Sequence, residues 1–238
     1  MSDNHHHHHE EHFEQPEFVR DIVIGMSDGL TVPFALAAGL TGAVASNGII
    51  ITAGVAEIIA GSIAMGLGGF LAGQTEVEHY DSELKREYSE LQTHYETERK
   101  EVKEIFGQYG LSPSSQELIM CEMEKDHDKW VDFMMRFELG LEKPDANRAR
   151  KSAVNIGVSY IVGGLIPLMA YVFTETPKNG LLYSSLITIV CLFIFGYYKS
   201  KYTSQSPLLG ALKVTGIGVL AAAAAFTIAT LFGKYFGV

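Results

Sequence analysis

Cysteine is almost absent from this 238-residue chain: only Cys121 and Cys191 occur, one in a charged stretch and one inside an apolar run. A disulfide between such different surroundings is implausible, and no Cys-x-x-Cys pair indicates a zinc or redox site. The start of the chain, MSDNHHHHHEEHFEQPEF, lacks the basic first residues and apolar core of a cleaved signal peptide. Its histidine run is either a purification tag or a flexible, weakly metal-binding tail, and we assign no site to it.

Charge is missing from long parts of the sequence. Of the 28 acidic residues, 19 lie between Glu76 and Asp145, and 12 of the 18 basic residues lie between Lys85 and Lys151. On either side, five apolar stretches are long enough to cross a hydrocarbon core of about 30 Å as helices. These are residues 22–45, 48–73, 153–173, 181–198 and 208–232. The pattern predicts an all-α integral membrane protein with a charged domain inserted between spans 2 and 3.

Positive charge in the short loops predicts the orientation of the spans. Arg20, Lys199 and Lys201 fall on the same side of the membrane as the charged segment. Because such residues favour the cytoplasmic side, we expect the N-terminus and the charged domain there. The expected organisation is a His-rich cytoplasmic tail (1–20), spans 1 and 2 (21–74), a cytoplasmic metal-binding domain (75–151) and spans 3 to 5 (152–238).

Three helices are expected in the charged domain. Residues 75–104 contain no glycine or proline and predict one long helix. Ser114 or Ser115 is the candidate N-cap of a second helix near 116–127, and a third is expected near 128–141.

Acidic residues share one face of the expected long helix. Like charges spaced four apart cost a few tenths of a kcal/mol per pair, so a cation is expected to face them. Carboxylates with an imidazole suit Fe²⁺, Mn²⁺ or Zn²⁺. The alternative is an ordinary solvated face of a charged helix. At 100° per residue, this face carries Glu76, Glu83, Glu87, Glu90, His94, Glu98 and Glu101.

The third expected helix adds two soft donors. Met134 and Met135 precede Glu138 by four and three residues, so their thioethers can approach its carboxylate, although paired methionines are often plain packing. One Glu-x-x-His motif, Glu124 to His127, is also present. A di-iron oxidase needs two such motifs with two further glutamates. A ferroxidase is therefore disfavoured.

Spans 1 and 2 contain acidic residues but no lysine, arginine or histidine to neutralise them. Asp28 lies inside span 1 and Asp21 at its edge, while span 2 holds Glu57 with Met65 on the same face. An intramembrane carboxylate is costly and is a functional site by default, and it can exchange a proton for a cation. The alternative is an inert, protonated structural acid. Gly61 and Gly68, also on that face, would let another helix approach closely.

Three segments resemble the signature segments of the vacuolar iron transporter family: RDIVIGMSDGLTVPFALAAGL, AEIIAGSIAMGLGGFLAGQTEVEHY and DFMMRFELGLEKPD. The resemblance covers the chain from Phe18 onward. It implies five membrane helices per subunit and a homodimer with the pathway at its interface. It further implies export of Fe²⁺ from the cytosol in exchange for protons, with Mn²⁺ carried by some members.

The resemblance also implies which residues act. Its transport-path positions correspond to Asp21, Asp28, Glu57 and Met65. Nothing in the middle helix matches closely, so Glu124 and His127 receive no role. The cytoplasmic metal-binding positions correspond to Glu87, Glu90, Glu98, Glu101, Met134, Met135 and Glu138.

The expected function is thus a proton-coupled Fe²⁺ antiporter that is not an enzyme. Binding of Mn²⁺ or Zn²⁺ is also expected, and neither an organic cofactor nor a nucleic-acid partner is expected. The membrane would be vacuolar in a eukaryote and the plasma membrane in a bacterium. The alternative is a membrane-anchored metal sensor or buffer, which would have no use for Asp28 and Glu57 inside the bilayer.

Overall fold

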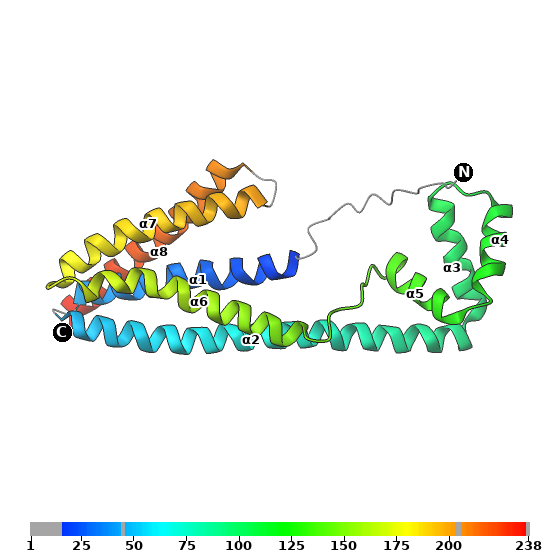
Figure 1. The fold of residues 1–238 in the computed structure, drawn as a ribbon, viewed down its shortest axis with the longest axis horizontal. Helices are drawn as coiled ribbons and strands as arrows, with labels where there is room; N and C mark the ends of the chain where they lie inside the picture. Colours follow the sequence, from blue (N-terminus) through cyan, green and yellow to red (C-terminus); the bar gives the residue numbers. More distant parts are fainter. Residues whose placement is uncertain (1–15, 44–45, 203–205, 237–238) are drawn as a thin grey trace, which may run out of the picture. The chain divides into compact units, whose positions relative to one another are not determined.

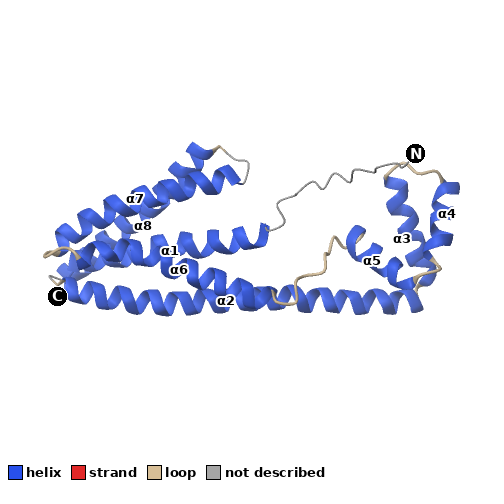
Figure 2. Cartoon of the chain, viewed as in Figure 1, coloured by secondary structure: helices blue, strands red, loops and turns tan. Residues whose placement is uncertain are grey.

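The computed structural model describes residues 16–43, 46–202 and 206–236 (Figure 1). Within these ranges the chain is helical and contains no strand (Figure 2). The helices are α1 (Pro16–Ala43), α2 (Asn47–Thr93), α3 (Tyr95–Gln108), α4 (Pro113–Met123), α5 (His127–Phe137), α6 (Arg148–Val172), α7 (Pro177–Tyr202) and α8 (Pro207–Phe236).

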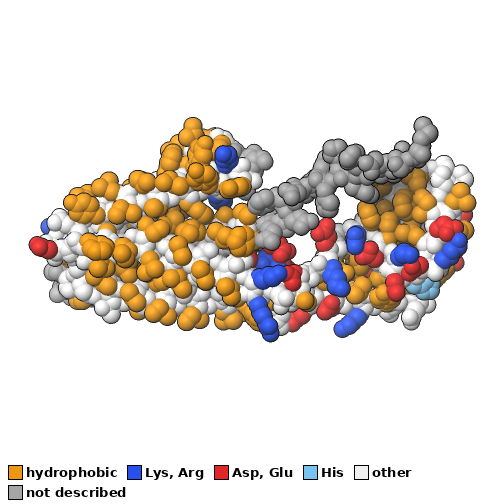
Figure 3. All heavy atoms as spheres, in the orientation of Figure 1, with side chains coloured by type: hydrophobic (Ala, Val, Ile, Leu, Met, Phe, Trp, Pro, Cys, Tyr) orange, Lys and Arg blue, Asp and Glu red, His pale blue; other side chains and the backbone are white. Residues whose placement is uncertain are grey.

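Five of these helices are long and apolar enough to cross a membrane: α1, α2, α6, α7 and α8. The prediction of an all-α protein with five spans is therefore confirmed. Hydrophobic side chains cover the visible face of α1, α6, α7 and α8, whereas acidic and basic side chains gather over the later part of α2 and over α3 to α5 (Figure 3).

The chain divides into two compact units. Residues 1–70 and 151–238 form one, called here the membrane unit, and residues 71–150 form the other, called the charged unit. Helix α2 contributes to both, because it continues without a break from Asn47 to Thr93. The charged unit thus consists of the end of α2, the helices α3, α4 and α5, and the first residues of α6.

Glycine lets helices of the membrane unit approach closely. A Cβ added at Gly29 of α1 would lie 2.9 Å from the Cα of Tyr160 in α6. Gly61 of α2 lies against the Tyr160 ring, as expected for the small-residue face of span 2. Gly68 does not follow that expectation, because a Cβ there would have no neighbour within 4 Å among the described atoms. Tyr160 is therefore held between α1 and α2.

The charged unit has its own small hydrophobic core. Trp130 of α5 is fully buried there, and its ring lies edge-on to that of Tyr95 at the start of α3, with centroids 5.4 Å apart. Ion pairs from Arg99 of α3 to Glu117 and Glu124 hold α4 against α3. The core residues are Tyr80, Leu91, Val102, Met120, Trp130, Val131, Met134 and Met135.

The expected single helix over 75–104 is wrong, because these residues are divided between α2 and α3. Its first part belongs to the long α2, and the chain leaves the helical conformation at His94, where φ is −129° and ψ is 33°. The Oγ1 atom of Thr93 lies 2.8 Å from Nδ1 of His94 at this break. Leu91 and Val102 would lie about 16 Å apart along one straight helix. Both side chains lie in the same core, so the break interrupts the helix but allows the two residues to be buried together.

The two following helices begin earlier than expected. Helix α4 starts at Pro113, and the Oγ atom of Ser112 accepts a hydrogen bond from the Ser115 N–H at 3.3 Å. The cap is thus Ser112 rather than Ser114 or Ser115, since proline is well suited to the first helical position. Helix α5 starts at His127, with Asp126 accepting from the Lys129 N–H at 3.2 Å.

Candidate metal centre and membrane carboxylates

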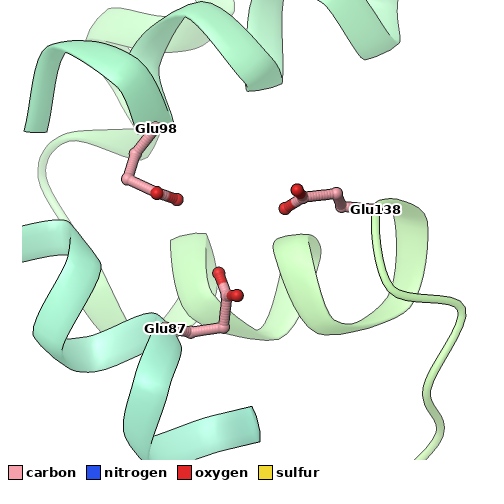
Figure 4. A group of neighbouring side chains, drawn as sticks. All are labelled: Glu87, Glu98 and Glu138. Carbon is pink, nitrogen blue, oxygen red and sulfur yellow. The ribbon is translucent and has the colours of Figure 1, made fainter. Parts of the chain in front are cut away.

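Three glutamates from different parts of the charged unit meet at one point. One carboxylate oxygen from each of Glu87, Glu98 and Glu138 lies within 4.8 Å of the other two. Figure 4 shows the three side chains directed toward a common space from α2, from α3 and from the end of α5. Glu87 is only 2% exposed and Glu98 only 4%, whereas Glu138 lies at the surface.

The helix break at His94 makes this meeting possible. On one continuous helix, Glu87 and Glu98 would be separated by about 16 Å along the axis. Glu138 caps the C-terminus of α5, and its N–H donates to the Met134 carbonyl at 3.0 Å. Gly140, with a φ of +64°, then reverses the chain, a conformation that glycine adopts without strain.

The carboxylates are electrostatically unfavourable together. Burial raises the pKa of Glu87 to about 7, and the negative charges of Glu138, Glu90 and Glu101 add to this shift. The pKa of Glu98 is raised to about 7 by burial first and then by Glu101, Glu87, Glu138 and Glu90. Burial, Glu101 and Glu90 also raise the pKa of Glu138. These five glutamates therefore form one coupled group, called here the glutamate cluster.

One cation of the chain opposes the repulsion. The Nη2 atom of Arg86 lies 2.8 Å from Glu83, and its Nε atom lies 3.6 Å from Glu90. Arg86 also lowers the pKa of Glu87 and Glu138, but these effects are smaller than those of burial. The fold thus brings a further carboxylate from α5 to the acidic face and leaves a net negative site, which a divalent cation would neutralise.

The other acidic positions of the expected stripe have different surroundings. Glu76 accepts a hydrogen bond from Nε of the buried Arg148 at 3.1 Å, and Glu83 pairs with Arg86. His94 is exposed at the helix break. A projection that assumes one straight helix does not show this break.

Met134 and Met135 lie in the hydrophobic core of the charged unit, both fully buried. Their carbonyls accept hydrogen bonds from the chain that follows: Met134 from Leu139 at 3.1 Å, and Met135 from Leu141 at 2.7 Å. The two residues therefore fix the end of α5 and with it the position of Glu138. Packing accounts for their burial, and both residues lie within about one helical turn of Glu138 along the chain.

The Glu-x-x-His motif does not lie on one helix. Glu124 is the C-cap of α4 and pairs with Nε of Arg99 at 2.7 Å, whereas His127 is the first residue of α5. The two side chains therefore lack the i, i+3 arrangement that a di-iron site uses.

Glu57 of the membrane unit has a specific partner. The hydroxyl of Tyr160 donates a hydrogen bond to its Oε1 atom, whereas its Oε2 atom is buried without a hydrogen-bond partner among the described residues. Tyr160 was not among the candidates read from the sequence, because an uncharged aromatic residue in an apolar span gives no distinguishing signal. It is fixed by the two glycines, Gly29 and Gly61, that lie against it.

The remaining predicted path residues also lie in the membrane unit. Asp21 is buried, and the hydroxyl of Ser152 donates to its Oδ1 atom at 3.2 Å. Asp28 is half-buried and immediately precedes Gly29, where α1 and α6 approach closely, as they also do at Gly25. Met65 is half-buried on α2, two turns after Glu57.

The sequence profile of the VIT family matches residues 19–230. The chain belongs to the VIT family. It is 50% identical over 228 residues to vacuolar iron transporter 1 of Oryza sativa subsp. japonica, covering 96% of this chain and 90% of the relative. Its identity to vacuolar iron transporter 1 of Arabidopsis thaliana is 52% over 219 residues, with 92% and 88% covered.

A more distant fungal protein is also similar to this VIT family chain. Protein CCC1 of Saccharomyces cerevisiae is 37% identical over 226 residues, which cover 92% of this chain and 70% of that protein. The family resemblance seen in the sequence is thereby confirmed. The plant relatives are named as transporters, in agreement with the expectation that this multi-pass membrane protein is not an enzyme.

Proposed function

We propose that this protein moves Fe²⁺ out of the cytosol across the vacuolar membrane, in exchange for protons. The names of the plant relatives support iron as the cargo and the vacuole as the location. Arg20 near the start of α1 and Lys199 and Lys201 near the end of α7 support a cytosolic N-terminus and a cytosolic charged unit. The carboxylates of both units support a route built from acids that exchange protons for metal.

Glu57 is the observation that favours transport over binding alone. Its Oε2 atom is buried without a hydrogen-bond partner among the described residues, and it lies in a helix apolar enough to span the membrane, where an acid without a function would be costly. A proton on this oxygen and a passing cation would exclude each other. Asp21, Asp28 and Met65 are the other proposed members of the path, and Tyr160 would orient the Glu57 carboxylate.

The glutamate cluster is the proposed loading site. It would bind Fe²⁺ at the cytosolic mouth and release the protons that its raised pKa values hold near neutral pH. Met134 and Met135 stay in the proposed set as soft donors close to Glu138. Because oxygen and thioether donors accept several divalent ions, Mn²⁺ and Zn²⁺ are expected to compete.

A homodimer is proposed because the family resemblance implies one. In the membrane unit, Ala64 and Gly68 of α2 are exposed, and a helical projection places both within about 20° of Glu57, on the same side of the helix as Met65. A second copy packed on this face would line the path with Glu57 and Met65 from both subunits. The same face would otherwise contact lipid.

A sensor or buffer remains the second candidate, because the glutamate cluster would serve it equally well. The deciding experiment is anaerobic Fe²⁺ uptake into proteoliposomes with an imposed pH gradient, for the wild type and for Asp28→Ala. Gradient-dependent uptake that disappears in Asp28→Ala supports the antiporter. Glu175→Gln, in the segment between α6 and α7, is the matched control and should transport normally. Wild-type protein that binds Fe²⁺ but moves none under any gradient would instead make it a sensor or buffer.

A further inference from the structure

A pocket of about 460 Å³ lies in the membrane unit between the end of α7 and the beginning of α8. Lys199 and Ser200 reach it from α7, and Lys213 reaches it from α8. Ser206, just before α8, adds a second hydroxyl, while Leu209 and Ile217 form an apolar wall. None of these residues belongs to the proposed transport path.

Close helix packing creates this pocket. A Cβ added at Gly196 of α7 would lie 2.9 Å from the Cα of Ala211 and 3.0 Å from the carbonyl oxygen of Gly210 in α8. The two backbones therefore touch, and no long side chain fits into the crossing. Lys199 from α7 and Lys213 from α8 line the pocket beside this crossing, so each helix contributes one basic side chain to it.

The polar and apolar parts of the pocket match the two parts of a lipid. No aspartate or glutamate follows Glu175 in the sequence, so α7, α8 and the segment that joins them add only positive charge here. Leu209 is 68% exposed and Ile217 is 56% exposed, so an apolar surface continues from the pocket toward the centre of α8. A phosphate group beside the lysines would thus have space for its acyl chains along α8.

We propose that this pocket binds the headgroup of an anionic phospholipid, with its phosphate between Lys199 and Lys213 and its acyl chains against Leu209 and Ile217. Basic pockets between membrane helices are known to hold such headgroups. With the orientation proposed above, the lipid comes from the cytosolic leaflet. The site does not depend on iron transport, so either proposal can fail without the other.

Lysines at helix ends also extend toward the membrane surface without any specific lipid, and this is the alternative to exclude. Lys213 lies six residues into α8, about 9 Å from its first residue along the axis. Two other lysines serve as a comparison, because Lys178 lies in the first turn of α7 and Lys234 in the last turn of α8, and neither lines this pocket.

The test uses the full chain, delipidated in detergent, and measures the binding of phosphatidylinositol by native mass spectrometry and by the shift in thermal unfolding. Lys199→Gln/Lys213→Gln is expected to weaken binding at least about tenfold, since each lysine contributes to anionic lipid attraction. Lys178→Gln/Lys234→Gln removes the same charge and should change binding by less than about twofold. Thermal unfolding without lipid verifies that both double variants fold. If one of them does not fold, the corresponding single-substitution variants are measured instead.

Three outcomes would overturn the proposal. Equal weakening in both double variants would show that only net charge matters. Equal binding of phosphatidylcholine would remove the requirement for an anionic lipid. Equal stabilisation by inositol 1-phosphate, which has no acyl chains, would identify the ligand as a soluble phosphate ester rather than a lipid.

Discussion

The two units of this protein use the same kind of side chain in opposite ways. In the membrane unit, Glu57 and Asp21 each have a hydroxyl partner on α6 that donates a hydrogen bond. In the charged unit, Glu87, Glu98 and Glu138 approach one another instead, and burial raises the pKa of all three. A carboxylate that accepts a hydrogen bond from a hydroxyl is held in place, whereas carboxylates held against one another store repulsion that a cation relieves. The first arrangement suits passage of an ion, and the second suits its capture.

The largest effect is expected from a substitution in the membrane unit, which should abolish transport without changing metal binding by the charged unit. Glu57→Gln should reduce Fe²⁺ uptake to the level of protein-free vesicles, because the amide cannot exchange a proton for metal. Metal binding by the charged unit should remain at the wild-type level in the same protein. Tyr160→Phe removes only the donor and should reduce uptake about threefold to tenfold, the usual net contribution of one hydrogen bond.

This prediction is checked by vesicle uptake together with Co²⁺ titration of the detergent-solubilised chain. If Glu57→Gln weakened Co²⁺ binding as strongly as it weakened uptake, the division of labour between the units would be wrong. Normal uptake by Glu57→Gln would remove Glu57 from the path.

The next effect concerns capture. Glu98→Gln should lower Co²⁺ or Mn²⁺ affinity at least about tenfold, because even the loss of a ligand's outer partner typically costs about 10–100-fold. Uptake at saturating Fe²⁺ should persist. Glu104→Gln, an exposed acid on the same helix, is the matched control and should bind metal normally. Calorimetric titration of both variants distinguishes the cluster from a general loss of negative charge.

The pH dependence follows from the raised pKa values. The ordinary carboxyl pKa of 4.5 rises to about 7 for Glu87 and Glu98, so between these values the folded protein holds more protons than the unfolded chain. Stability without metal should therefore fall as pH rises from about 4.5 to about 7 and then level off. Metal binding at pH 6 should release about one to two protons, and almost none at pH 8.5.

Titration in two buffers of different ionisation enthalpy measures this proton release. Release that is the same at pH 6 and pH 8.5 would contradict the raised pKa values, as would stability without metal that increases from pH 5 to pH 7.

The smallest effect concerns Arg86, whose positive charge already pairs with the acidic residues of the charged unit. Arg86→Gln should increase metal affinity at pH 8.5 by up to about fivefold, because it removes a positive charge that competes for Glu90, in a pair of the strength usual at surfaces. At pH 6 the gain should shrink, since Arg86 also lowers the pKa of Glu87. Lys100→Gln, which removes an exposed lysine that pairs with Glu104, is the control and should leave the affinity unchanged. Weaker binding in Arg86→Gln at pH 8.5 would show that the arginine organises the site.

The sequence predicts the membrane part of this fold well, because hydropathy reports the length of each span directly. It predicts which glutamates gather in the charged unit but gives the wrong geometry for them. A projection at 100° per residue places Glu87 and Glu98 on one face of a helix, whereas the structure brings them together across the break at His94. A break caused by the burial of Trp130 and Met134 against a distant helix leaves no local signal at His94.

The partners of the acids were harder to predict than the acids themselves. An intramembrane carboxylate is conspicuous in a sequence because it is rare. Tyr160 is not conspicuous, because every tyrosine has a hydroxyl and this one lies about one hundred residues after Glu57 in the chain. Tyr160 is distinguished by its contacts with Gly29 and Gly61. These contacts depend on the packing of α1, α2 and α6, which the sequence does not show.

The end of α5 has a further consequence. Glu138 caps the C-terminus of that helix, where the partial charge of the backbone is already negative, so the empty cluster is opposed by the helix as well as by its neighbours. Whatever binds only the folded form stabilises it by mass action. We therefore expect the metal-free protein to open more often and to be degraded faster in cells than the loaded protein. The supply of metal would then set how many copies of the protein persist as well as how fast each one works.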